Sequence, residues 1–190
     1  QTAFLMAVLT LISKMIGFVR EMVMANYFGT SYITDAYVMA TAIPSVIFGG
    51  ILAAVSTAYM PNFSKIVENQ GIEKGNQFTS EIINLVFVIS LISGTIGFVF
   101  SDQIVALFAN GFEGETAQLT SIFVKITFSC VIFSSISGIF DAYLQYKGFF
   151  LPPIITGYLL SFCTIIFIII CAHTSYYYLP FGMLLGYILR

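Results

Sequence analysis

The sequence predicts an all-α membrane protein, a polytopic bundle of about six transmembrane helices. Hydrophobic residues make up 58% of the 190 residues and charged residues only 8%, whereas an average soluble domain has about 25% charged residues. Apolar segments recur along the chain with short polar stretches between them. Because a membrane-spanning helix needs about 20 apolar residues, these segments are typical of spanning helices.

The predicted helices follow these apolar segments in order. They cover residues 3–25, 32–59, 80–100, 120–144, 152–172 and 179–190. The last has about half the residues that a spanning helix needs, and the chain begins with Gln1 rather than Met. We therefore expect residues 1–190 to form one N-terminal transmembrane unit of a longer transporter.

The first apolar segment contains three charged residues, Lys14, Arg20 and Glu21. At 100° per residue, Glu21 lies nearly above Lys14, and Arg20 lies roughly 120° away from it. Charges at membrane depth are costly, and they usually face a water-filled cavity or a partner rather than lipid. The three residues are either a cationic lining for an anionic substrate or an ion-pair network between helices, and we favour the lining.

Three further charges lie in or beside the apolar segments. Lys125, in the middle of the fourth segment, is a second candidate for a cavity residue; an ion pair with Glu21 is the alternative. Asp35 lies at the start of the second segment, where Asp commonly caps a helix. Asp141 lies near the end of the fourth segment, from which its carboxylate can reach the membrane interface.

Helix breakers interrupt the second segment. Pro44 removes a backbone hydrogen bond and predicts a bend, which transporters commonly place beside a central site. The pair Gly49–Gly50 follows it. Small residues allow membrane helices to approach closely, and we favour this packing role for the glycine pair.

The connections predict the orientation in the membrane. Residues 61–79 and 145–151 contain Lys65, Lys74 and Lys147, whereas residues 26–31, 101–116 and 174–178 contain no Lys or Arg. Positively charged loops face the cytoplasm, so the N-terminus is expected there too. Three consecutive tyrosines close the last of these connections, as in an aromatic belt at the membrane interface.

The sequence contains no pattern of an enzyme or of a cofactor site. It has no Ser/His/Asp set, no phosphate-binding glycine loop and no metal-ligand cluster,. Its three cysteines lie in apolar segments, where a free Cys packs as a small hydrophobic residue. No basic patch indicates nucleic acid. We expect neither catalysis nor a cofactor.

Several short motifs together carry a family resemblance. They are Ser13–Glu21 (SKMIGFVRE), Asn26–Gly29, Thr34–Tyr37, Ile43–Pro44 and Ala58–Pro61, followed later by Ala109–Phe112 and Lys125–Phe128. As a spaced set they resemble the MurJ/MviN family of lipid II flippases, which belongs to the multidrug/oligosaccharidyl-lipid/polysaccharide exporter superfamily. The resemblance extends over essentially all 190 residues.

The resemblance implies about fourteen helices in two lobes around a central cavity, with this chain as the first lobe. It implies that the protein moves lipid II, the undecaprenyl-linked peptidoglycan precursor, from the inner to the outer leaflet of the bacterial cytoplasmic membrane. Lys14 and Arg20 match basic cavity positions of the family, and Asp35 matches a recurrent acid. Glu21 stands where the family usually has Asp. Residues 41–59 carry no charge, whereas the family has two basic residues and an acid in its second helix.

Other functions remain open at this point. The protein could export another polyprenyl-linked oligosaccharide, or be a drug/cation antiporter of the same superfamily. Basic cavity residues disfavour a cationic substrate. A non-transporting scaffold would not need ionisable groups at membrane depth. A lipid-linked diphosphate fits best, because fixed cations in a hydrated cavity replace the solvation of its headgroup while two lobes alternate in access.

Overall fold

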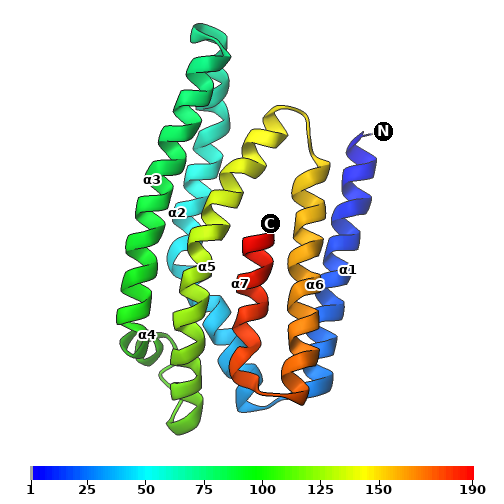
Figure 1. Ribbon diagram of the computed structural model, residues 1–190, viewed down its shortest axis with the longest axis vertical. Helices are drawn as coiled ribbons and strands as arrows, with labels where there is room; N and C mark the ends of the chain where they lie inside the picture. The colour runs from blue at the N-terminus through cyan, green and yellow to red at the C-terminus, as the bar shows by residue number, and fades with distance from the viewer. Residues whose placement is uncertain (1) are drawn as a thin grey trace.

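The computed structural model describes residues 2–190, with the side-chain surroundings of residues 2–5, 51, 52 and 56 excepted. All of its regular structure is helical, which confirms the predicted all-α class (Figure 1). The elements are α1 Thr2–Phe28, α2 Tyr32–Gln70, α3 Ile72–Val99, α4 Ser101–Phe108, α5 Gly114–Tyr146, α6 Leu151–His173, the 3-10 turn η1 Tyr176–Tyr178, and α7 Leu179–Leu189.

Four of the described helices are long and apolar enough to cross a membrane, namely α2, α3, α5 and α6. The N-terminal helix α1 has 27 residues and α7 has 11, and neither is among the four. Four of the six expected segments therefore meet both the length criterion and the apolarity criterion for a membrane-spanning helix.

The polar stretch expected as a loop at residues 61–79 is a helical hairpin. Helix α2 continues to Gln70, and α3 begins at Ile72. The single residue between them, Gly71, has φ 86, a conformation that glycine adopts without steric cost. The 39 residues of α2 extend over about 58 Å at 1.5 Å per residue. The hydrocarbon core of a bilayer is about 30 Å thick, so α2 is longer than one crossing requires. The hairpin extends past the other helices at the top of Figure 1.

An aromatic cluster explains why this stretch is helical. Phe63 is fully buried, and its ring lies 5.5 Å from that of Tyr59 and 4.7 Å from that of Tyr146 on α5. The hydroxyl of Tyr59 is hydrogen-bonded to that of Thr79 on α3 at 2.7 Å. The hairpin thus has its own small core against the end of α5, which favours ordered helices over a loop.

A second stretch expected as a loop, residues 101–116, contains helix α4. Its first residue, Ser101, accepts a hydrogen bond from the Ser121 hydroxyl of α5 at 3.0 Å. Val105 is buried against α5 as well. The Ser121 hydroxyl also contacts the Asp102 carboxylate of α4. Polar and apolar contacts together therefore fix this short helix across the end of the bundle.

Helix α5 is the central element of the bundle, and it packs against α2, α3, α4 and α7 (Figure 1). Its contact with α3 depends on small residues. A Cβ added to Gly97 would lie 1.9 Å from the ring of Phe128, and one added to Gly94 would touch the Phe128 carbonyl at 3.5 Å. Glycine at position 97 allows the two helices to approach closely, as small residues do in membrane bundles.

Pro44 lies inside α2, and α5 replaces the hydrogen bond that it removes. In an α-helix the N–H of residue 44 would donate to the Ala40 carbonyl, but proline has no N–H. The Thr127 hydroxyl of α5 donates to that carbonyl at 2.7 Å. Figure 1 shows α2 changing direction in its middle. The predicted bend is present, and a neighbouring helix satisfies the freed backbone group.

The packing role expected for Gly49–Gly50 is wrong for the described structure. No heavy atom lies within 4 Å of a Cβ added at either glycine. Gly49 instead lines a cavity of about 210 Å³ between α2, α5 and α7, together with Pro44 and Tyr187. Gly49 therefore borders open space at this point and does not bring two described helices together.

Candidate functional site

The charges of α1 form an ion pair within that helix. The Arg20 guanidinium donates to one carboxylate oxygen of Glu21, with Nη2 at 2.6 Å and Nε at 3.2 Å. The Arg20 side chain is 30% exposed and that of Glu21 is 59% exposed. Since both residues belong to α1, their pair does not tie two helices together. These two residues therefore do not form the ion-pair network between helices that was the alternative interpretation.

The other expected cations are not paired in the described part of the chain. Lys14 is exposed on α1 and lies within salt-bridge distance of no described carboxylate. Lys125 is half-buried on α5, and its alternative pairing with Glu21 is absent from the described ion pairs. Helix α1 packs mainly on α6 and only weakly on α2, so the fold leaves Lys125 on a helix that α1 does not cover.

Asp35 is exposed in the first turn of α2. The N-cap residue of this helix is Ser31, so Asp35 is not the cap that the sequence suggested. A carboxylate in the first turn still interacts favourably with the positive end of the helix dipole. Its position beside the α1–α2 connection puts it at the end of the bundle opposite the α2–α3 hairpin (Figure 1).

One polar group near the α1 ion pair was missed by the sequence analysis. The Tyr37 side chain of α2 is 7% exposed, and its hydroxyl has no hydrogen-bond partner among the described residues. Both Arg20 and Glu21 lie within electrostatic range of it. Arg20 also lies within electrostatic range of Tyr187 on α7. The α1 charges therefore lie near phenol groups of two other helices, which periodicity along a single helix does not reveal.

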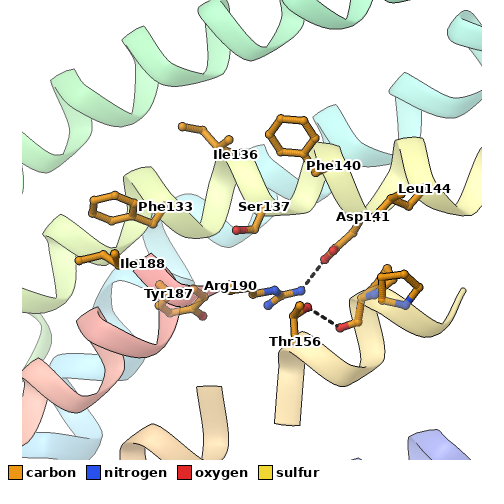
Figure 2. A pocket seen from close by; sticks show the side chains of 12 residues that line it. Phe133, Ile136, Ser137, Phe140, Asp141, Leu144, Thr156, Tyr187, Ile188 and Arg190 are labelled. Carbon is orange, nitrogen blue, oxygen red and sulfur yellow. Dashed lines mark hydrogen bonds and ion pairs between the residues drawn. The ribbon is translucent and has the colours of Figure 1, made fainter. Parts of the chain in front are cut away.

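A second ion pair joins Asp141 of α5 to Arg190, the residue that follows α7 (Figure 2). Each side chain is 20% exposed, and Arg190 Nε is buried without a described partner. Asp141 binds this arginine, and its expected position near the membrane interface stays a prediction. The two residues are 49 positions apart, so no spacing rule could have paired them.

This second pair lines a cavity of about 300 Å³ between α5, α6 and α7. Figure 2 shows the ion pair beside Ser137 and Thr156, whose hydroxyl donates to the Pro153 carbonyl at 3.1 Å. Phe133 and Phe140 provide apolar walls. No group of metal-ligating side chains is present among the described residues.

The helical bundle, with four described helices long and apolar enough to cross a membrane, defines a class, the polytopic membrane proteins. The family model described as "Lipid II flippase MurJ" matches residues 24–190. The chain belongs to this family, as its motifs indicated. The matched range begins after Lys14, Arg20 and Glu21, so the match does not assign a role to these residues.

Relatives and a solved structure agree with this assignment. The chain is 32% identical over 167 residues to the "Probable lipid II flippase MurJ" of Buchnera aphidicola subsp. Baizongia pistaciae (strain Bp), covering 86% of this chain and 32% of the relative. It is 31% identical over 158 residues to the "Lipid II flippase MurJ" of Thermosipho africanus (strain TCF52B), covering 82% of this chain and 32% of the relative.

The solved structure is "Lipid II flippase MurJ, inward closed conformation". It superposes with a TM-score of 0.79 at 28% identity, over 98% of this chain and 40% of the other. The predicted fold class is thereby confirmed. The chain spans about a third of the length of the curated relatives it matches.

Proposed function

We propose that these residues form the first lobe of a two-lobed lipid II flippase, which moves the undecaprenyl-linked peptidoglycan precursor from the inner to the outer leaflet of the bacterial cytoplasmic membrane. The observation that carries the proposal is the family match over residues 24–190. The relatives' shared name favours lipid II over another polyprenyl-linked glycan. The second lobe belongs to the part of the protein beyond these residues.

The proposed headgroup site centres on Arg20 and Lys14. A guanidinium has five N–H donors, and Arg20 uses those on Nε and Nη2 toward one oxygen of Glu21. The remaining donors are available to a diphosphate, which a planar guanidinium binds through two hydrogen bonds at once. Glu21 holds the guanidinium in place. Lys14, exposed on the same helix, adds a second positive charge.

Asp35 and Lys125 complete the proposed substrate-binding residues. Lys125 is half-buried without a described carboxylate partner, and a cation at membrane depth commonly marks a substrate pathway. Asp35 lies exposed at the end of the bundle opposite the hairpin (Figure 1). Its carboxylate suits the neutral or cationic groups of the headgroup rather than its phosphates.

Substitution of Arg20 tests the headgroup role. In the full-length protein, Arg20→Ala should abolish complementation of a flippase-depleted strain while the protein still accumulates in the membrane. Arg20→Lys should retain partial function, because the charge remains but the two-pronged donor geometry is lost. Since the Arg20 and Glu21 side chains are both partly exposed, loss of their pair should change stability little.

Two further substitutions serve as controls. Lys14→Ala should impair complementation, whereas Thr10→Ala, a neutral change at an exposed position of the same helix, should be tolerated. If Arg20→Ala and Glu21→Ala lowered the amount of protein equally, the pair would be structural only. If Arg20→Ala complemented normally, the headgroup role would be excluded.

A further inference from the structure

Three tyrosines line a small pocket. They are Tyr32 at the start of α2, and Tyr176 and Tyr177 of η1. The segments that carry them, the start of α2 and the turn η1, lie at the end of the bundle opposite the α2–α3 hairpin (Figure 1). The pocket has a volume of about 150 Å³. Its other polar side chains are Glu115 and Gln118 in the first turns of α5. We call this the tyrosine pocket.

The rings of the tyrosine pocket are held at defined angles. The rings of Tyr32 and Tyr176 meet edge to face, with centroids 6.4 Å apart and planes at 81°. Those of Tyr176 and Tyr177 are 4.6 Å apart and tilted by 31°. The nearby Tyr176 hydroxyl, and with a smaller effect the Glu115 carboxylate, raise the pKa of Tyr177. The phenol groups and the carboxylate therefore converge on one place.

An aromatic belt at the membrane interface accounts for tyrosines at this depth, but not for this arrangement. Belt residues point separately toward lipid headgroups. Here Tyr178, which is 57% exposed and packs toward Phe181, fits that description. Tyr176 and Tyr177 instead line a hollow that also contains a carboxylate and an amide.

Glu115 and Gln118 are three residues apart, so they lie side by side on one face of α5. A carboxylate only accepts hydrogen bonds, whereas an amide both donates and accepts. Neighbouring hydroxyls of a sugar ring need this combination, since each donates and accepts at once. The C–H face of a pyranose is apolar and packs on the face of an aromatic ring. Tyr32 and Tyr177 line the pocket and are 37% and 46% exposed, so their rings are accessible to such a ligand.

We propose that the tyrosine pocket binds one uncharged sugar unit of a glycan. Its volume suits a single pyranose ring. The inference rests on the proposed function, because the sugar is then that of the transported glycolipid. On the predicted topology the pocket lies at the outer surface, so it receives the sugar after the headgroup has crossed.

A small organic cation is the competing occupant, because aromatic rings and a carboxylate also attract cations. Two observations favour the sugar. The ring planes are tilted or edge to face, so they do not form a cage of faces around one point. Gln118 supplies N–H donors, for which a cation has no use.

Saturation-transfer NMR on the full-length protein in lipid nanodiscs tests the proposal, with N,N′-diacetylchitobiose as the probe. Tyr177→Leu should weaken binding about five- to tenfold, because the aromatic contact is lost. Tyr177→Phe should stay within about twofold, since the ring remains. Tyr178→Leu, the neighbouring tyrosine outside the pocket, should bind as the parent does.

Glu115→Gln separates the two occupants, with tetramethylammonium as the second probe. The amide keeps the hydrogen-bonding shape, so disaccharide binding should fall by no more than about threefold. The proposal would be overturned in favour of a cation site if tetramethylammonium bound, Glu115→Gln abolished that binding, and the disaccharide did not bind. Equal effects of Tyr177→Leu and Tyr178→Leu would also overturn it. If either of these two results is found while lipid II transport is retained, the proposed function stands. If the disaccharide binds but lipid II is not transported, only the proposed function is refuted.

Discussion

One hydrogen bond between distant residues satisfies the backbone at the bend in α2. The Thr127 hydroxyl reaches across from α5 to the carbonyl that Pro44 leaves without a donor. In an apolar surrounding such a carbonyl has no water to bind. Because Pro44 on α2 has no N–H, position 127 on α5 needs a hydrogen-bond donor of the size of threonine.

Thr127→Val, which keeps the shape but removes the donor, should lower the free energy of unfolding of the full-length protein by about 1–3 kcal/mol. Denaturant titration in detergent measures this change. The matched control is Thr95→Val, since the exposed Thr95 hydroxyl donates only within its own helix, to Leu91. It should change stability by less than about 0.5 kcal/mol. Equal losses for the two variants would show that the bond to α5 contributes nothing.

The sequence analysis identified individual residues with special roles, but it did not identify the residues that they contact. It identified Pro44 as a bend and Asp141 as a charge near the end of an apolar segment, because both signals are local. It could not identify Thr127 or Arg190 as their partners, since 87 and 49 positions separate the paired residues. Such pairs depend on which helices pack together, and hydropathy alone does not determine that.

At the scale of elements, the hairpin of α2 and α3 is the main departure from expectation. Its polar residues indicated a loop, yet Lys and Glu are good helix formers, and the Tyr59–Phe63 cluster supplies a core. Hydropathy detects where a helix leaves the membrane, and it does not detect where the helix ends. Hydropathy also missed helix α4, because its eight residues are too few to span a membrane,.

The predicted orientation puts this hairpin in the cytoplasm, because it carries two of the three lysines found in the connections,. Glu68→Cys should react with a membrane-impermeant maleimide only after the cells are opened. Glu113→Cys, at the opposite end of the bundle, should react in intact spheroplasts. Both glutamates are exposed, and the native Cys130 and Cys171 are buried. Labelling of Glu68→Cys from outside would reverse the topology.

At the scale of the whole molecule, the 190 residues hold one of the two lobes proposed for the transporter. The chain covers about a third of the length of its relatives. Expressed alone and reconstituted, these residues should insert but not move lipid II, because on the two-lobe proposal they supply only one side of the cavity. A fluorescent lipid II flipping assay measures this, with the full-length protein as control. Robust transport by the fragment would exclude the two-lobe proposal.

The long separation between Pro44 and its partner helix has a consequence for biosynthesis. A ribosome adds about 5–20 residues per second, and the Thr127–Ala40 bond spans 87 positions. The Ala40 carbonyl is therefore made roughly 4 to 17 s before the hydroxyl that binds it. Throughout that interval α2 carries an unsatisfied backbone group that is costly in lipid. The bent helix α2 therefore inserts stably only after α5 has left the ribosome, because α5 carries the hydroxyl that binds the Ala40 carbonyl.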